Sequence, residues 1–301
     1  MAPVKTNVAC PLCEAEGGIP VVIRNGLQVV RCLNCRHRYV SPVPSDEQLA
    51  EIYDRAYYSG GHGSVGFSDY AGLAPARRRM FMRHLDRIER LMRPGRVLDV
   101  GCATGDFLKV ARERGWDPLG VDPSPARELA TAAGLRIVGR TIGEAQVEPA
   151  SVDLITFWDV LEHLPNPVAV LQQAVRLLSP RGLIAVTVPD AGNSVARLSG
   201  QRWFGYKTAG EHLQFFNPGT LRRTFAAAGL EIELRSPVPW SCTVGFLVDR
   251  AGLYLGPPGR WARRFFSGRR IAELVVDVPQ VNQFAIARRA AIAGRPEQRS
   301  A

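Results

Sequence analysis

Short apolar runs alternate with amphipathic segments through the middle of the chain, and this alternation predicts an α/β fold. Runs such as Val97–Val100 and Val152–Trp158 are aliphatic and β-branched, as expected for strands buried on both faces of a sheet. The expected strands are residues 97–100, a run that ends at residue 121, 135–138, 152–158, 181–188, 230–235 and 281–288. Apolar residues recur with helical spacing in the segments 76–92, 107–114, 124–133, 168–178 and 221–228. This order indicates a doubly wound, mostly parallel sheet of seven strands, with ligands at the carboxyl ends of the strands.

The flanking segments differ in composition and predict further parts of the chain. We expect an N-terminal module over residues 1–44, a helical linker with a lid over 45–94, a main domain over 95–290 with helices inserted at 239–275, and a disordered tail at 291–301. The linker has a glycine-rich stretch with Tyr57, Tyr58 and His62, which is typical of a loop that closes over a substrate. A plain connection is the alternative. The inserted segment is rich in aromatic and basic residues. It is expected to lie on a membrane surface or to cover the acceptor cleft. The alternative is that its helices only pack on the edge of the sheet.

A glycine loop follows the first strand of the main domain and opens a helix. It runs from Gly101 to Gly105, and Asp122 closes the next strand 21 residues after Gly101. An acidic residue at about this distance suits a ribose, because a carboxylate accepts hydrogen bonds from hydroxyl groups. Asp99 and Asp106 flank the loop, where they would repel a pyrophosphate but suit the α-amino group of a methionine moiety. The loop therefore predicts S-adenosylmethionine rather than a dinucleotide.

The cofactor-binding candidates lie where the predicted strands end. They are Asp99, Gly101, Cys102, Ala103, Gly105, Asp122, Pro123, Thr141, Trp158 and Asp159. Residues 95–190 resemble the core of class I S-adenosylmethionine-dependent methyltransferases, whose first motif reads hydrophobic-Leu-Asp-x-Gly-x-Gly-x-Gly. Ala103 stands at the middle glycine of that motif, and we expect its methyl group to require a negative φ. The resemblance implies a Rossmann-like fold and S-adenosylmethionine as the methyl donor.

The segment after the fourth predicted strand carries acidic residues and a histidine. The sequence from Asp159 to His163 resembles a motif of the ubiquinone-biosynthesis and related small-molecule branch of these enzymes. In some members of that branch such residues hold a divalent cation near the acceptor hydroxyl. The resemblance makes Asp159, Glu162 and His163 candidates for this role, and packing at the cofactor edge is the alternative for Glu162 and His163.

A second acidic residue and histidine stand side by side further along the chain. Glu211 and His212 are similar to the Glu-His-Leu-x-x-Phe segment of the same branch, where the chain folds over the acceptor pocket. An imidazole with a pKa of about 6.5 can take up a proton near neutral pH, so His212 is the candidate general base and Glu211 would orient its ring. His163 is the rival catalytic base. A purely structural role is the alternative for all three residues.

Four of the six cysteines form two Cys-x-x-Cys pairs. Cys10 and Cys13 are separated by 18 residues from Cys32 and Cys35, which is the spacing of a zinc ribbon. Two such turns supply four thiolates and leave no position open for water, so the zinc would be structural. Apolar runs between the pairs, with a turn at Asn25-Gly26, predict the short strands of a ribbon. A disulfide or a redox dithiol is the alternative.

Composition narrows the function classes. The net charge of +10 comes almost entirely from arginine, which indicates a solvated basic face or an anionic partner. No apolar run is long enough to span a membrane, and the first residues lack the pattern of a signal peptide, so we expect a cytoplasmic protein. The ribbon and core together resemble bacterial methyltransferases of secondary-metabolite and cell-surface glycan pathways.

We therefore expect an enzyme that transfers a methyl group from S-adenosylmethionine to a hydroxyl of a small molecule, secondary metabolite or glycan. The alternative is an RNA methyltransferase whose ribbon and basic surface bind phosphates. It is less favoured because Asp159-Val160-Leu161 stands where base-amino methyltransferases carry Asn/Asp-Pro-Pro-aromatic. A non-catalytic cofactor-binding scaffold is disfavoured by the intact loop and Asp122.

Overall fold

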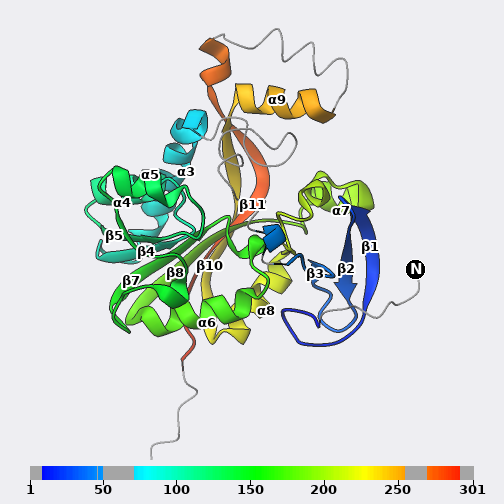
Figure 1. The fold of residues 1–301 in the computed structure, drawn as a ribbon, viewed down its shortest axis with the longest axis horizontal. Coiled ribbons are helices and arrows are strands. Elements are labelled where there is room, and N and C mark those ends of the chain that lie inside the picture. Colours follow the sequence, from blue (N-terminus) through cyan, green and yellow to red (C-terminus); the bar gives the residue numbers. More distant parts are fainter. Residues whose placement is uncertain (1–8, 46, 50–70, 255–269, 292–301) are drawn as a thin grey trace, which may run out of the picture.

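A three-layer α/β domain and a smaller four-stranded sheet beside it make up the protein (Figure 1). The computed structural model describes residues 9–45, 47–49, 71–254 and 270–291. Tyr57, Tyr58 and His62 of the predicted lid lie outside these residues. None of the helices in the described residues has an apolar stretch long enough to cross a bilayer.

The large sheet has seven strands in the order β10-β11-β8-β7-β4-β5-β6. These strands are β4 (Arg96–Val100), β5 (Asp117–Val121), β6 (Arg136–Gly139), β7 (Val152–Trp158), β8 (Leu178–Pro189), β10 (Leu230–Thr243) and β11 (Val275–Arg289). β11 runs antiparallel to both β8 and β10, and the pairings among the other strands are parallel. The predicted doubly wound sheet is therefore confirmed. Its strand order reverses between β4 and β7, and open α/β sheets bind their ligands at such a reversal.

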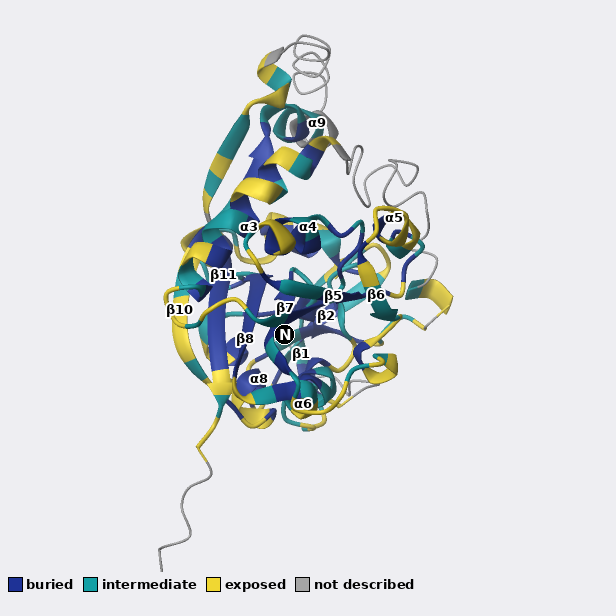
Figure 2. Ribbon diagram, turned by 90° about the vertical axis from the view of Figure 1, so that its left-hand side faces the viewer, coloured by how far each residue is buried: buried dark blue, intermediate teal, exposed yellow. Residues whose placement is uncertain are grey.

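Helices cover both faces of this sheet and bury its strands (Figure 2). One face carries α3 (Ala74–Ile88), α4 (Asp106–Glu113) and α5 (Arg127–Ala132), and the other carries α6 (Pro167–Leu177) and α8 (Pro218–Ala227). Side chains of β4 alternate between the two cores, because successive residues of a strand point to opposite faces. Val97 packs with α3 and α4, whereas Leu98 and Val100 pack with α6 and α8. Burial on both faces explains why the sequence of β4 does not alternate between apolar and polar residues.

The N-terminal residues form the ribbon predicted from the cysteine spacing, but its sheet is not independent. It contains β1 (Gly18–Arg24), β2 (Leu27–Cys32), β3 (Arg38–Val40) and β9 (Gln214–Phe215), in that order. Asn25 and Gly26 have φ values of 51° and 75°, which is the two-residue hairpin turn expected at this place. The last strand, β9, comes from the main domain and pairs with β3. The ribbon and the main domain therefore share one sheet.

The last two strands are longer than the sequence predicts, and the expected helical insertion is correspondingly shorter. β10 continues to Thr243 and β11 begins at Val275, so the prediction of helix over residues 239–243 is wrong. Pro237 and Pro239 lie within β10, which is an edge strand of the large sheet and whose register shifts between Val238 and Trp240. Proline is tolerated at both kinds of position. The inserted helices in the described residues are α9 (Val244–Tyr254) and the 3-10 helix η6 (Arg270–Glu273).

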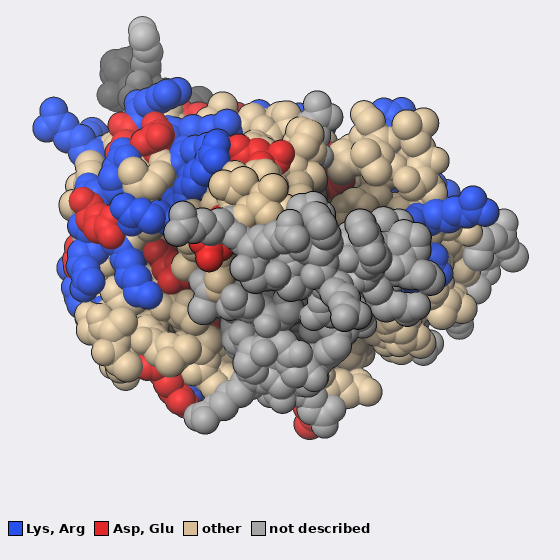
Figure 3. Space-filling view, turned by 90° about the horizontal axis from the view of Figure 1, so that it is seen from above, with Lys and Arg blue, Asp and Glu red and all other residues tan. Residues whose placement is uncertain are grey.

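Basic side chains gather on one side of the molecule and are interleaved with acidic ones (Figure 3). Many of those on α3 and α4 are paired with carboxylates. The pairs include Arg77 with Asp106, Arg78 with Glu113, Arg83 with Asp277, and Arg114 with Asp86 and Glu89. The Arg78–Glu113 pair is exposed and typical of a solvated surface, whereas the Arg77–Asp106 pair is largely buried.

The loop between β4 and α4 generates a prediction about stability. Gly105 has φ of 78°, and a Cβ at this position would overlap Cδ1 of Leu135. We expect Gly105→Ala to lower the free energy of unfolding by about 2–5 kcal/mol, from backbone strain together with overpacking. Gly115→Ala is the matched control, because its φ is 84° but no atom lies within 4 Å of the added methyl group. The control should lose only about 1–2 kcal/mol in urea denaturation; equal losses in the two variants would contradict the packing argument.

Candidate active site

The glycine loop packs tightly against the end of β7. Gly101 has φ of 76°, and a Cβ there would lie 2.6 Å from Cγ2 of Val160. Glycine is therefore required at this position both for its backbone conformation and for the close approach of Val160. The loop ends at Gly105, which caps the N-terminus of α4.

Ala103 adopts a conformation that the sequence analysis did not expect. Its φ is +45°, so the prediction of a negative φ is wrong. Its backbone N–H donates a hydrogen bond of 2.7 Å to Oδ2 of Asp122, and both groups are buried. A charge-assisted hydrogen bond to a buried carboxylate is stronger than an ordinary one and offsets part of the strain of a left-handed alanine. Ala103 therefore adopts a backbone conformation that glycine reaches without strain.

Asp122 organises the loop while keeping capacity for a ligand. Oδ2 accepts the N–H of Ala103, and Oδ1 accepts both the N–H and the hydroxyl of Ser124. An ionised carboxylate offers about four acceptor sites, so one site remains on Oδ2. That site suits a ribose hydroxyl. Asp122 would thus bind the cofactor and hold the loop in shape.

Asp99 brings a second buried carboxyl group to the same place. It is 2% exposed and accepts a hydrogen bond of 2.7 Å from the hydroxyl of Thr156. Burial, reinforced by the nearby charge of Asp122, raises the pKa of Asp99 to about 8. A positively charged group placed beside it would favour the ionised form. The α-amino group of S-adenosylmethionine fits this requirement.

The N-terminus of α4 is unsuited to a pyrophosphate. Asp106 occupies its first turn and is paired with Arg77 and Lys109. These cations, together with burial acting in the opposite direction, leave the pKa of Asp106 below its usual value. The Asp106 carboxylate occupies the turn where a pyrophosphate would bind, which agrees with a cofactor that has none.

The other predicted cofactor residues lie along the same edge. Cys102 is buried, Pro123 is exposed, and Thr141 precedes the 3-10 helix η2 (Ile142–Glu144). Trp158 is buried between His84 and Phe107, with ring centroids at 4.9 and 5.3 Å. Its indole N–H is buried and has no hydrogen-bond partner among the residues that the structure describes. Roles in cofactor binding stay predictions for these four residues.

A second cluster combines residues from two distant segments. Glu162 and His163 lie in the 3-10 helix η3 (Leu161–His163) after β7, and His212 precedes β9. One ligand atom from each of the three residues lies within 4.8 Å of the other two. The ring centroids of His163 and His212 are 4.7 Å apart, and Nε2 of His163 is 3.9 Å from Oε1 of Glu162.

The hydrogen bonds and burial of this cluster suit a divalent cation. Nδ1 of His163 lies 2.8 Å from the backbone carbonyl of Glu211, so Nδ1 carries the proton and Nε2 carries the lone pair. Metal-binding histidines commonly make such a bond. Burial lowers the pKa of His163 to about 4 and that of His212 well below its usual value, so both rings are neutral at pH 7. Among the described residues, no other side chain donates to the carboxyl group of Glu162, and burial together with Asp159 raises its pKa.

The membership of this cluster differs from the grouping suggested by the sequence. Asp159 was grouped with Glu162 and His163, but its Oδ1 accepts a hydrogen bond of 2.9 Å from the amide of Asn282. His212 takes its place beside the other two. Asp159 has φ of +54°, a conformation that few non-glycine residues adopt and that often occurs at functional sites. The carboxyl group grouped with His212 is that of Glu162, whereas Glu211 contributes its backbone carbonyl to His163.

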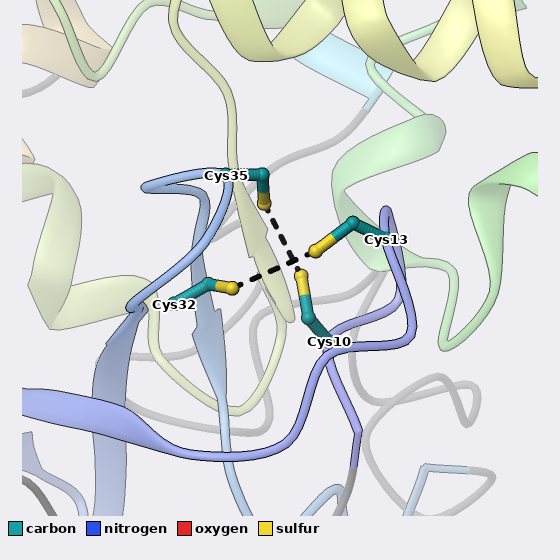
Figure 4. Close-up of side chains that lie close together, drawn as sticks. All are labelled: Cys10, Cys13, Cys32 and Cys35. Carbon is teal, nitrogen blue, oxygen red and sulfur yellow. Dashed lines mark hydrogen bonds between the residues drawn. The ribbon is translucent and has the colours of Figure 1, made fainter.

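The four cysteines meet at one point of the ribbon (Figure 4). The Sγ atoms of Cys10 and Cys35 are 3.5 Å apart, and those of Cys13 and Cys32 are 3.7 Å apart. A tetrahedral zinc site with Zn–S bonds of about 2.3 Å places its sulfur atoms about 3.8 Å apart. Burial raises the pKa of the Cys10 thiol and raises that of Cys35 to about 11. A cation among them would stabilise the thiolates, so the cysteine geometry fits zinc.

The fold and these sites agree with comparisons to known proteins. A family profile described as "Methyltransferase domain" matches residues 74–234, more than half of the chain. The chain belongs to the class I S-adenosylmethionine-dependent methyltransferases. This methyltransferase is 31% identical over 149 residues to a protein of Idiomarina loihiensis named "Ubiquinone biosynthesis O-methyltransferase", across 45% of this chain and 61% of the relative. A protein of the same name from Azorhizobium caulinodans is 27% identical over 171 residues, across 52% of this chain and 68% of the relative.

A solved structure supports the fold of the methyltransferase. It is the 1,6-didemethyltoxoflavin-N1-methyltransferase of Burkholderia thailandensis, with bound 1,6-didemethyltoxoflavin and S-adenosylhomocysteine. The TM-score is 0.50 at 18% identity, and the match covers 86% of this chain and 98% of that one. At this identity the likeness concerns the fold alone.

Sequence reasoning missed three polar residues that support the site. Asn282 binds Asp159, while His37 and Gln214 bind each other between the ribbon and the main domain. Asn282 and Gln283 are polar residues within an apolar strand and are both buried. Two polar residues in an otherwise apolar strand could have indicated a buried polar contact at this place. His37 and Gln214 are 177 residues apart, and nothing in the local sequence indicated their contact.

Asp122 provides a direct test of the cofactor site. We expect Asp122→Ala to weaken binding of S-adenosylmethionine by about 1.5–3 kcal/mol, the value of a hydrogen bond to a charged group. The variant also loses the acceptor for Ala103, so the loss should be larger than in Asp122→Asn, which keeps one carbonyl oxygen. Isothermal titration calorimetry gives both affinities. Unchanged affinity in Asp122→Ala would rule out the assigned site.

Proposed function

We propose that this methyltransferase moves the methyl group of S-adenosylmethionine to a hydroxyl of a small molecule or glycan. The observation that carries the proposal is the position of the Glu162–His163–His212 cluster. It follows β7, which pairs directly with β4, and β4 leads into the cofactor loop. A group that handles the acceptor's proton and a group that holds the donor therefore lie at one sheet edge. The names of the O-methyltransferase relatives also favour oxygen as the acceptor.

The chemistry asks two things of the protein. Methyl transfer from a sulfonium is an in-line displacement, so the acceptor oxygen must be aligned with the methyl carbon and sulfur. The hydroxyl must also lose its proton. His212 and His163 are neutral, and each can accept a hydrogen bond from that hydroxyl or take up its proton.

Imidazoles whose pKa is lowered are weak bases, and this property affects how the proton of the acceptor is removed. Glu162, Nε2 of His163 and His212 are the residues that would hold a divalent cation. When bound, such an ion lowers the pKa of a coordinated hydroxyl. The two histidines would then act as ligands rather than as proton acceptors.

The structure gives little support to the RNA alternative. Of the ribbon's basic residues, His37 is fully buried and Arg38 donates to the backbone carbonyl of Ala191. Both are used to join the ribbon to the main domain. Membrane contact through residues 239–275 and a cytoplasmic location stay predictions.

His212 tests the proposed role of the cluster. A general base contributes about 10²–10⁴-fold to the rate, so we expect His212→Ala to lower turnover by tenfold or more, while the affinity for S-adenosylmethionine stays within twofold. Formation of S-adenosylhomocysteine would be measured over a panel of phenols, catechols and sugars, with calorimetry for the cofactor.

The His163→Ala variant would be tested in the same assays. Loss of turnover in both variants supports a shared cluster, and loss in His163→Ala alone assigns the base to the loop after β7. Normal turnover in both would show that alignment alone drives the reaction. Methyl transfer to nitrogen or to RNA, with none to any hydroxyl, would overturn the proposed function.

We also propose that the four cysteines bind one structural zinc ion per chain. Elemental analysis of freshly reduced protein should find one equivalent of zinc, and Cys32→Ser/Cys35→Ser should lose it, because two of the four thiolates are removed. Full zinc content in the double variant would contradict the site. Since the ribbon shares β9 with the main domain, the double variant should also unfold at a lower temperature than the parent protein.

A further inference from the structure

The side-chain amide of Gln214 joins the ribbon to the loop after β7. Its Nε2 donates to the backbone carbonyls of Leu164 and Pro165, at 2.9 and 3.3 Å. Its Oε1 lies 2.9 Å from Nε2 of His37. Gln214 and His37 are 2% and 0% exposed, so water does not compete for these bonds.

The donors and acceptors of this junction have one consistent arrangement. Two carbonyls face the amide nitrogen, which fixes the amide oxygen toward His37. His37 must then donate from Nε2, as a neutral ring does in one of its two tautomers. The ring is also held between aromatic neighbours, with Tyr39 and Phe216 at centroid distances of 6.2 and 5.2 Å.

Backbone hydrogen bonds extend the junction in both directions. On one side, the N–H of Leu213 donates to the carbonyl of Glu162 at 2.7 Å, and the N–H of Val40 donates to the carbonyl of Leu213 at 2.9 Å. On the other side, the N–H of Cys32 donates to the carbonyl of His37 at 2.8 Å. A chain of short bonds therefore runs from a cysteine turn to the residues that flank His163 and His212.

We propose that Gln214 and His37 are positioning residues, which hold the Glu162–His163–His212 cluster in register through their buried hydrogen bond and so make acceptor activation depend on the ribbon. The inference rests on the proposed function for the role of that cluster. The residues that contact the cofactor loop, among them Asp122, Val160 and Leu135, belong to the main domain. Loosening the junction should therefore disturb the acceptor side and spare cofactor binding.

The test uses the full-length, zinc-loaded protein. His37→Phe keeps an aromatic ring against Tyr39 and Phe216 but removes the donor, and His37→Gln restores an N–H donor of shorter reach. Leu33→Gln is the matched control, because Leu33 lies in the same cysteine turn with its side chain 51% exposed.

The primary readout is the tautomer of each histidine, from nitrogen-15 NMR of histidine-labelled protein. The chain has five histidines, so signals can be assigned by substitution. The wild type should show His163 as a single Nδ1–H tautomer. In His37→Phe the signals of His163 and His212 should shift or broaden, the signal of His84 on the opposite face should not, and His37→Gln should restore them at least in part. Unchanged His163 and His212 signals in His37→Phe would overturn the proposal.

Binding and turnover complete the test. We expect His37→Phe to keep its zinc and to bind S-adenosylhomocysteine within twofold of the wild type, while kcat falls at least tenfold. Leu33→Gln should match the wild type throughout. An equal loss of cofactor affinity and kcat in His37→Phe would indicate general destabilisation and contradict a positioning role. If the wild type methylates no hydroxyl, the proposed function fails, whereas the NMR result still decides whether the junction orders the cluster.

Discussion

Buried acidic groups crowd the carboxyl edge of the large sheet, and the surrounding structure is arranged to hold them. Asp99, Asp122 and Glu162 are buried there, and Asp159 is partly buried. Placing several carboxyl groups in a low-dielectric region disfavours their ionised forms. The chain supplies hydrogen-bond donors to the first three of them, from Thr156, from the Ala103 and Ser124 backbone, and from Asn282. The remaining deficit is one of positive charge, which a sulfonium cofactor with its ammonium group and a divalent cation would supply.

The cofactor side of this edge could be predicted from the sequence, because short segments of the chain carry the patterns that identify it. The strands around β4 and β7 are recognisable as apolar runs, and the loop from Gly101 to Gly105 is recognisable by its spacing to Asp122. The conformation of Ala103 is different, because it depends on a hydrogen bond to a residue 19 positions away. Preference for negative φ was the correct local rule, and a tertiary contact overrode it.

The acceptor side was less predictable, because it also depends on contacts between residues that are far apart in the chain. Glu162 and His212 each stood out in the sequence, but no periodic pattern showed that they meet. The strand that brings them together, β9, has two residues, which is too short to leave a hydrophobic period. Pairing of β9 with the ribbon also explains why a module that looks separable in sequence is part of one sheet in space.

The edge strand β10 affects how readily two copies of the protein can pair through their sheets. β10 exposes a row of backbone groups on the side away from β11, and such an edge is a template for pairing with another chain. Two prolines, Pro237 and Pro239, interrupt the donors of that row, and Glu231 and Arg235 place charges along it. These features hinder sheet-to-sheet association between copies along β10. The two prolines therefore make the outer edge of β10 a poorer template for strand pairing.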